Sequence, residues 1–195
     1  MILRRLSLLA PLAAMSLAGC GVNQIPAADE AAKAKWADVE NQYQRRADLI
    51  PNLVSTVKGY ATHEQSTLEG VTAARAKATS ITISGDDLKN PAKMQQFQQA
   101  QDQLGASLGR LLAVKEAYPQ LQADQNFLAL QSQLEGTENR IAVARSDYNA
   151  SVQQYNTLIR TFPDAITAKL VYGAKPITPF TATTPDAQSA PKVSF

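Results

Sequence analysis

The sequence predicts an all-α protein, an elongated antiparallel bundle of three or four long helices that ends in a Pro-rich C-terminal tail. In the later part of the chain, apolar residues recur seven apart, and a second series offset by three runs between them, which indicates the seam of a helical bundle. Two earlier stretches show the same helical periodicity. The chain is rich in Ala and Gln and only 6% aromatic, a composition that favours helices packed through small side chains.

Residues 1–19 are predicted to be a lipoprotein signal peptide, which is removed from the mature protein. Arg4 and Arg5 make a short basic start, and the apolar run that follows is shorter than the roughly 20 residues needed to span a bilayer. This run ends in Leu-Ala-Gly directly before Cys20, the only cysteine of the chain. The arrangement resembles a bacterial lipobox, so we expect Cys20 to carry the lipid. An ordinary secretory signal with an incidental cysteine is the alternative.

Residues 20–28 are predicted to be the lipidated Cys20 and a linker, so that the membrane is reached through the lipid and the bundle faces the periplasm. Gly21 in place of Asp favours the outer membrane if the organism has two membranes. Removing Arg4 and Arg5 lowers the 19 basic residues to 17, which equals the 17 acidic ones. A neutral mature chain has no electrostatic footprint for nucleic acid, so we expect no nucleic-acid partner.

The bundle is predicted to span residues 29–163, and its first helical run covers about 29–78. Pro51 lies inside this run and cannot donate a hydrogen bond to the carbonyl of Ala47, so we expect a kink there, or a stop and restart. The polar residues around this break are Arg45, Arg46, Asp48 and Asn52. The two arginines are suited to the freed carbonyls, and the other two side chains to the amides of a restart. We interpret the cluster chiefly as hinge chemistry, with a docking corner for a partner as its functional alternative.

The second run covers residues 91–118. Asn90 is a good N-cap and Pro91 a good first helical residue, because proline's missing N–H has no helical partner there in any case. The third run covers about 124–162 and ends at Pro163. Its repeat is Phe127, Leu134, Ile141, Tyr148, Tyr155 and Phe162, interleaved with Leu130, Thr137, Ala144, Ser151 and Leu158.

Five glycines lie inside the helical runs, and we expect them to mark places where two backbones approach closely: Gly59, Gly70, Gly105, Gly109 and Gly136. Residues 164–195 are predicted to form a short helix and an extended tail rich in Pro and Thr. The apolar side chains of Phe180, Val193 and Phe195 favour a tail that packs partly on the bundle.

Enzyme and metal signatures are nearly absent. His63 is the only histidine, so the pair of histidines that a helical zinc site needs cannot form. Asp86 and Asp87 lack the alternating oxygen ligands of a calcium loop. Cys20 is expected to be acylated, which removes it as a nucleophile. The sequence therefore predicts a protein that is not an enzyme and has no cofactor and no metal.

One polar pattern on the third helix is of functional interest: Glu138, Arg145, Asn149 and Asn156 are separated by 7, 4 and 7 residues and share one face. One interpretation is a polar seam that satisfies neighbouring groups and fixes the register of the bundle. The other is a groove that recognises a peptide or a partner helix.

Three segments resemble the LemA family: ENQYQRRADLIPNLVSTVKGYATHE (40–64), VTAARAKA (71–78) and TENRIAVARSDYNASVQQYNTLIRTFP (137–163). The likeness covers roughly residues 36–162. It implies an elongated antiparallel helical bundle in a bacterial envelope protein without an established activity. Members commonly begin with a membrane-spanning helix, whereas this sequence has a lipobox-like signal in that place.

The function predicted from these observations is that of a non-enzymatic envelope lipoprotein, a scaffold, adaptor or regulator of a membrane or periplasmic protein. The candidate partner-binding residues are Arg45, Arg46, Asp48, Asn52, Glu138, Arg145, Asn149 and Asn156. The alternative function is an enzyme that acts on cell-wall or envelope material through the polar face around Glu138 and Arg145. That alternative requires a second acid from another helix in the same pocket.

Overall fold

The computed structural model of the protein describes residues 23–181, and no β-strand occurs in that range. The all-α class predicted from the sequence is therefore confirmed for these residues. The long helices are α2 (Gln24–Tyr60), α3 (Gln65–Ser80), α4 (Pro91–Ala113) and α6 (Gln125–Leu158). The short elements are η1 (Asp87–Lys89), η2 (Val114–Ala117), α5 (Pro119–Gln122) and α7 (Asp164–Leu170). None of these helices is long and apolar enough to cross a membrane.

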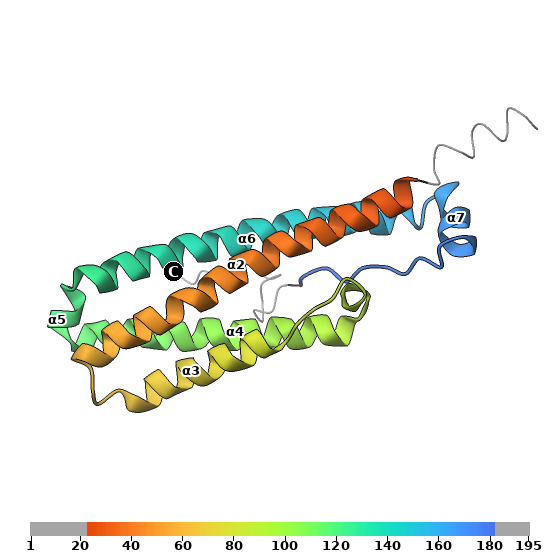
Figure 1. The fold of residues 1–195 in the computed structure, drawn as a ribbon. Helices are drawn as coiled ribbons and strands as arrows, with labels where there is room; N and C mark the ends of the chain where they lie inside the picture. The colour runs from red at the N-terminus through yellow and green to blue at the C-terminus, as the bar shows by residue number, and fades with distance from the viewer. Residues whose placement is uncertain (1–22, 182–195) are drawn as a thin grey trace, which may run out of the picture.

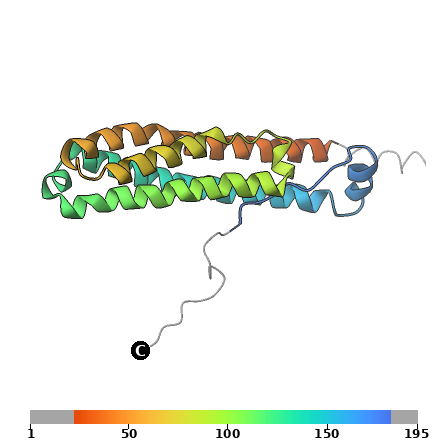
Figure 2. The ribbon, with the colours of Figure 1, turned by 90° about the horizontal axis from the view of Figure 1, so that it is seen from below.

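The long helices lie side by side and form an elongated rod (Figures 1 and 2). α2 packs along α6, and α3 packs against both α2 and α4. Since the 37 residues of α2 rise about 1.5 Å each, the rod is about 55 Å long. One end carries α7 and the first turn of α2, and we call it the α7 end; the opposite end carries α5 (Figure 1).

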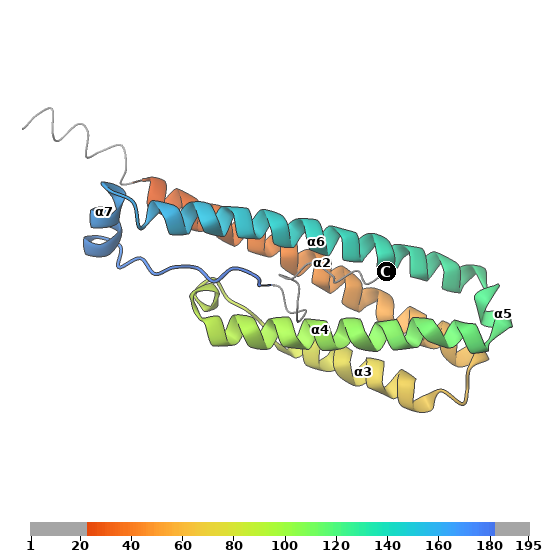
Figure 3. The same ribbon diagram turned by 180° about the vertical axis from the view of Figure 1, so that it is seen from behind.

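Beyond α7 the chain turns back along the rod as an extended segment, residues 174–181, which we call the strap. Figure 3 shows it running from the α7 end past η1 toward α4. The turn into the strap uses Gly173, whose φ of 55° lies in the left-handed region that favours glycine. Ile177 and Phe180 of the strap are buried, so this part of the tail packs on the bundle. The docking expected of Val193 and Phe195 lies outside the described residues.

The helix boundaries follow local capping chemistry. The Asn90 side chain accepts hydrogen bonds from the amides of residues 92 and 93, at 3.1 and 3.3 Å, which confirms its predicted role as the N-cap of α4. Asp124 caps α6 in the same way, through a 2.7 Å bond from the amide of Phe127. α6 ends at Leu158, four residues earlier than expected. Phe162, the last residue of the predicted repeat, is therefore outside the helix, and 81% of it is exposed.

Pro51 does not end its helix, because α2 continues through it from Gln24 to Tyr60. The break in the first helical run lies at residues 61–64 instead. The carbonyl of Ala47, which Pro51 leaves without its helical donor, accepts a 2.8 Å hydrogen bond from Nε of Arg75 on α3. The expectation that Arg45 and Arg46 donate hydrogen bonds to this carbonyl was therefore wrong. The donor is a side chain of the neighbouring helix α3.

The buried apolar residues form two clusters, one in each half of the rod. The cluster at the α7 end contains Trp36, Val39, Tyr43, Phe97, Ile141, Tyr148, Val152 and Tyr155, together with the strap residues Ile177 and Phe180. The cluster at the α5 end contains Ile50, Leu53, Val57, Leu104, Leu108, Leu111, Phe127 and Leu134. Between the two, the buried Arg46 of α2 donates to the buried Gln101 of α4 and to Glu138 of α6, which lies at the edge of the core. The core therefore has a polar layer at mid-length.

The predicted domain boundaries differ from the structure at the start of the bundle. The linker was expected to extend to residue 28, but residues 24–28 already belong to α2. A regular helix forms there because Ile25 is buried and packs this first turn of α2 against the core cluster at the α7 end. The predicted signal peptide, Cys20 and the last 14 residues of the tail lie outside the described residues.

Candidate functional site

Two asparagines of α6 hold the strap by its backbone. Asn149 donates to the carbonyl of Phe180 at 3.0 Å and accepts from the amide of the same residue at 2.8 Å. Asn156 makes the same pair of bonds with Ile177, at 2.8 and 2.9 Å. Each side-chain amide therefore pairs with one backbone unit of the strap, as a neighbouring strand would. We call the surface formed by Asn149, Asn156, Tyr148 and Tyr155 of α6 the strap groove.

The spacing of the two asparagines matches the repeat of an extended chain. Seven residues along a helix rise about 10.5 Å, and three residues of extended chain cover about 10 Å. Asn149 and Asn156 are seven apart on α6, while their partners are three apart on the strap. The match explains why both asparagines reach an equivalent backbone unit.

Further hydrogen bonds to the strap also involve its backbone. The hydroxyls of Tyr148 and Tyr155 donate to the carbonyls of Thr178 and Lys175, at 2.9 and 3.2 Å. The amide of Thr178 donates to the carbonyl of Leu88 in η1 at 2.8 Å. The side chain of Gln98 on α4 donates to the carbonyl of Thr181. Burial raises the pKa values of both tyrosines, so their hydroxyls remain donors at neutral pH.

One aromatic side chain anchors the strap. The ring of Phe180 stacks on Trp36, with the centroids 5.7 Å apart, and meets Tyr148 edge to face at 5.6 Å. The guanidinium of Arg145 lies 4.5 Å above the Phe180 ring centroid, within the range of a cation–π interaction. Phe180 therefore supplies an apolar anchor, while the asparagines and tyrosines recognise the backbone beside it.

Arg46 lies inside the bundle, only 4% exposed. Its guanidinium donates to Glu138 at 2.9 Å, and to the side-chain and backbone oxygens of Gln101 at 2.8 and 3.2 Å. Gln101 in turn donates to the carbonyl of Ala78 at the end of α3, at 3.4 Å. The four long helices are thus joined through one buried cation. Arg46 is therefore not part of an exposed docking corner.

The other members of the predicted corner on α2 stay on the surface. Arg45, Asp48 and Asn52 are exposed. Asp48 accepts a 2.7 Å hydrogen bond from Gln44 one turn earlier, and the backbone carbonyl of Asn52 accepts one from Thr56. The three residues line none of the clefts described here, so their binding role remains a prediction.

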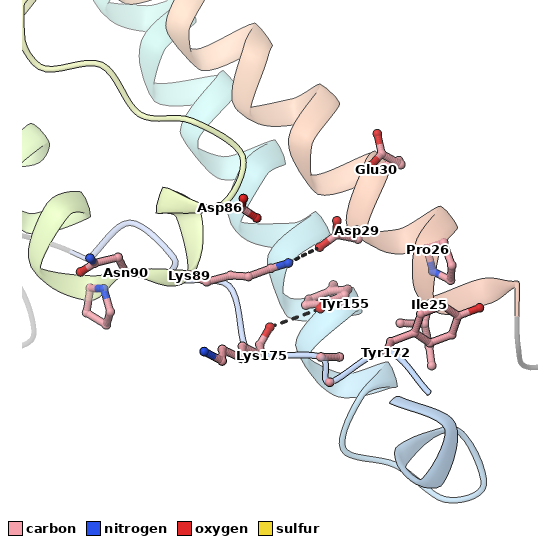
Figure 4. Close-up of a pocket in the computed structure, with 13 residues that line it drawn as sticks. Ile25, Pro26, Asp29, Glu30, Asp86, Lys89, Asn90, Tyr155, Tyr172 and Lys175 are labelled. Atoms are coloured by element: carbon pink, nitrogen blue, oxygen red, sulfur yellow. Dashed lines mark hydrogen bonds and ion pairs between the residues drawn. The ribbon is translucent and has the colours of Figure 1, made fainter. Parts of the chain in front are cut away.

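A cleft of about 730 Å³ lies at the α7 end, where the strap begins. Figure 4 shows its lining from α2, η1, α6 and the strap, including the 3.1 Å ion pair between Lys89 and Asp29. Burial alone would raise the pKa of Asp29, but the hydrogen bonds and charges of Lys33 and Lys89 together lower it. The same figure shows the Tyr155 hydroxyl directed at the carbonyl of Lys175. Asp29, the acid of this cleft with a shifted pKa, is therefore paired with two lysines, and the Tyr155 hydroxyl holds the start of the strap.

The structure separates the predicted polar face of α6 into two sites. Glu138 pairs with the buried Arg46, although its own side chain is 47% exposed. Asn149 and Asn156, in contrast, belong to the strap groove, and Arg145 lies above the Phe180 ring of the strap. Glu138 and Arg145 therefore do not meet in one pocket. No cluster of three or more metal-ligating His, Cys, Asp or Glu side chains occurs within residues 23–181.

The roles of Gln98, Gln101 and the hydroxyl groups of Tyr148 and Tyr155 were not predicted from the sequence. Glutamines are so frequent in this chain that neither stood out as a core residue, although both are buried. Tyr148 and Tyr155 were assigned to the apolar seam. Their hydroxyl groups, seven apart and each one residue before an asparagine, were the available signal for a repeated polar contact.

A family model described as "LemA family" matches residues 35–195. Over 150 residues, the chain is 31% identical to magnetosome protein MamQ 2 of Paramagnetospirillum magneticum, with 69% of this chain and 55% of that protein covered. Magnetosome protein MamQ of Magnetospirillum gryphiswaldense is 30% identical over the same shares of the two chains. Protein LemA of Metamycoplasma hominis is 29% identical over 119 residues, which cover 61% of this chain and 50% of that protein.

The chain spans about half the length of the curated relatives it matches. The segments that resembled the family in the sequence form the second half of α2 with the loop after it, the second half of α3, and the later part of α6 with the residues that follow it. They contribute Arg46, Arg75 and the two strap asparagines. Since the family model covers most of the sequence, the chain belongs to the LemA family.

Proposed function

We propose that the protein is a non-enzymatic lipoprotein of the bacterial cell envelope, and that its bundle is an adaptor for a membrane or periplasmic protein. In this proposal Cys20 carries the lipid, the bundle faces the periplasm, and Gly21 favours the outer membrane where two membranes exist. Family membership supports the envelope setting that the resemblance implied. The proposed site is the strap groove, and its proposed ligand is an extended polypeptide segment of the partner.

One observation carries this proposal: Asn149 and Asn156 each pair with both the amide and the carbonyl of one strap residue. Such bonds recognise extended backbone and tolerate any side chain that does not clash, because the groups they contact occur in every residue except proline. The apolar pocket that holds Phe180 adds one preference, for an aromatic ring. A partner segment of this description would take the place of the strap.

Peptide binding to the full chain tests the groove. The probe is a fluorescent peptide with the strap sequence AKPITPFT (174–181), and anisotropy measures its affinity. Phe180→Ala weakens the resident strap, so we expect this variant to bind the probe several-fold more tightly than the wild type. Adding Asn149→Leu should remove that binding, while adding Asn139→Leu, at an exposed asparagine elsewhere on α6, should not. Equal binding by all four proteins would contradict a groove that recognises backbone.

Crosslinking in intact cells tests the adaptor role. We expect one envelope protein to be recovered with the wild type, more of it with Phe180→Ala, and little with the double change Asn149→Leu and Asn156→Leu. Arg45→Glu reports on the exposed corner of α2 without touching the groove. Recovery of abundant envelope proteins alone, in equal amounts from every variant, would contradict the proposal.

Palmitate labelling tests the anchor. Labelled palmitate should enter the wild-type protein and not Cys20→Ala, which has no other cysteine to accept it. A wild type that stays unlabelled would refute the lipoprotein assignment and leave the groove proposal to be judged by the peptide experiment. The alternative of a cell-wall enzyme has no observation in its favour among residues 23–181, where Glu138 pairs with Arg46 and Arg145 covers Phe180.

A further inference from the structure

Exposed apolar side chains gather at the α7 end of the rod. Among residues 23–181, four of the five most exposed large apolar residues lie here: Phe162 at 81%, Leu170 at 78%, Val171 at 66% and Ile166 at 51%. We call these four the apolar tip. Val143, at mid-rod on α6, and Leu128, near the α5 end, are isolated by comparison. A cluster of this kind on a surface marks a contact with another molecule or with a membrane.

The first turn of α2 lies beside the apolar tip. α7 and the start of α2 are at the same end of the rod (Figures 1 and 3). Ile25 and Pro26 line the same cleft as Tyr172, the residue that follows Val171 (Figure 4). Asn23, the first described residue, is three residues after Cys20, and three residues extend at most about 11 Å.

These positions determine what the apolar tip meets. This inference rests on the proposed function, in which Cys20 is acylated. A lipid on Cys20 would hold the α7 end within about 11 Å of the bilayer surface, because no longer chain separates the two. The α5 end, about 55 Å away, has no such constraint.

The charges around the apolar tip suit a lipid surface. Arg160, Lys169 and Lys175 are exposed on residues 159–175, the segment that carries the tip, and its one acid is Asp164, so this segment has a net charge of +2. On the adjacent turn of α2, Asp29 and Glu30 are paired with Lys33 and Lys89. Long basic side chains can bond phosphate oxygens of the headgroups while neighbouring apolar side chains enter the acyl boundary. A protein partner at the tip would have to fit between the α7 end and the bilayer surface, which are held close together by the short chain to Cys20.

We propose that the apolar tip inserts into the interface of the bilayer to which Cys20 is anchored. The protein would then have two attachments, the lipid and the tip. A lipid alone leaves the rod free to tilt in any direction, whereas the second contact restricts its orientation and directs the α5 end away from the membrane. The acyl chains supply the affinity, and the tip supplies the orientation.

Quenching of added tryptophans by brominated phospholipids tests the insertion. The full lipidated chain is reconstituted into vesicles of phosphatidylcholine and phosphatidylglycerol, with and without brominated acyl chains. Leu170→Trp reports on the tip, and Val143→Trp is the matched control, because both positions are well exposed and only one is at the tip. Trp36 is buried in the bundle, so the wild type gives the background.

We expect several-fold stronger quenching of Leu170→Trp than of Val143→Trp, with Val171→Trp behaving like Leu170→Trp. Palmitate labelling and flotation with the vesicles are measured on the same samples. A labelled protein that floats, but whose tip tryptophans are quenched no more than the control, would overturn the inference and leave the lipid anchor standing. Dimers formed through the tip on the vesicles, with no quenching, would overturn it too. An unlabelled wild type that fails to float would overturn both the anchor and the inference.

Discussion

At the scale of single residues, Arg46 shows how one buried cation organises the molecule. Its charge is neutralised by Glu138, and its Nη2 donates to two oxygens of Gln101 that have little access to water. Burying a charged side chain is costly, but removing Arg46 from this cluster would leave the buried oxygens of Gln101 unpaired. The role of Arg46 is therefore structural, although a sequence pattern placed it beside three exposed polar residues.

We predict that Arg46→Met lowers the free energy of unfolding by about 2–3 kcal/mol, since it leaves two buried oxygens of Gln101 without their donor. Arg45→Met is the matched control: it removes the same side chain from the adjacent, exposed position, and its effect should stay within about 0.5 kcal/mol. Urea denaturation monitored by circular dichroism measures both. Similar losses in the two variants would show that the buried layer contributes no more than a surface arginine.

Asp87 connects the loop before α4 to the strap. Its carboxylate accepts from Lys93 at 2.6 Å and from the amide and hydroxyl of Ser84 at 3.0 and 2.9 Å, and these bonds lower its pKa from 3.8 to about 2. The next residue, Leu88, supplies the carbonyl that holds the amide of Thr178. A charged Asp87 therefore keeps η1 where the strap needs it.

The pH dependence follows from the sign of that shift. Because the pKa of Asp87 is lower in the folded state, its stabilisation is present above pH 3.8 and is lost as the pH falls toward about 2. We predict that the difference in unfolding free energy between wild type and Asp87→Asn shrinks over this range. Asp86→Asn, at the exposed neighbouring residue, is the matched control for removing a carboxylate from this loop. A difference that stays constant with pH would contradict the assigned bonds.

At the scale of helices and loops, Pro51 shows what sequence alone can and cannot determine. The rule that proline frees the carbonyl four residues earlier held for Ala47. The rule does not identify the donor that replaces the missing amide, because Arg75 is 28 residues away in the sequence and reaches the Ala47 carbonyl only after α3 folds back on α2. Periodicity predicted the helices, and the N-cap at Asn90 predicted the start of α4. The strap groove needed three-dimensional pairing between residues 20 to 31 positions apart, which no local pattern contains.

The coupling between Pro51 and Arg75 is testable by a double-mutant cycle. We predict that Arg75→Leu costs about 1 kcal/mol in the wild type, since it leaves the Ala47 carbonyl without a donor. In a Pro51→Ala background the amide of residue 51 can bond that carbonyl, so the same change should cost several tenths of a kcal/mol less. Lys77→Leu, on the same helix but bonded to Gln103, is the control and should show no coupling to Pro51→Ala. Additive effects for Arg75 would refute this account of the proline.

The glycines inside the helices gave an expectation that the structure does not support. A Cβ added at Gly59, Gly70 or Gly109 would meet nothing within 4 Å, so these residues do not mark close backbone approaches. We predict that Gly70→Ala and Gly109→Ala each stabilise the protein by about 0.5–1 kcal/mol, through helix propensity alone. Gly173→Ala should have the opposite sign, because φ there is 55°. Thermal unfolding measures all three, and a loss of stability at Gly70 or Gly109 would indicate a contact made by residues beyond those described.

At the scale of the whole molecule, the polar layer divides the rod into two apolar halves. A polar residue among apolar core positions sets the register of packed helices at some cost in stability, because any slip would bury its groups unpaired. The heptad pattern of α6 alone permits a slip of one repeat, since each apolar position has an equivalent seven residues on. The contact of Arg46 with Gln101 and Glu138 distinguishes the correct register from the others.

Replacing the entire layer should separate stability from register. We predict that the triple change Arg46→Met, Gln101→Leu and Glu138→Gln recovers most of the free energy that Arg46→Met alone loses, because the buried side-chain oxygen of Gln101 is then removed together with its donor and the half-exposed position 138 stays polar. The amide NMR spectrum of the triple variant should show more than one set of signals, from helices in alternative registers. A single sharp set of signals would show that the two apolar halves define the register without the layer.

The strap has one more consequence, which concerns competition. It is joined to α6 by residues 159–173, so its concentration at its own groove is of the order of millimolar, as for other short tethers. A free peptide at micromolar concentration would rarely displace such a resident ligand, even with equal intrinsic affinity. A segment confined to the same membrane patch, or presented in several copies, competes at a comparable local concentration. The groove would therefore respond to crowding of its partner at the membrane rather than to the partner's total amount in the cell.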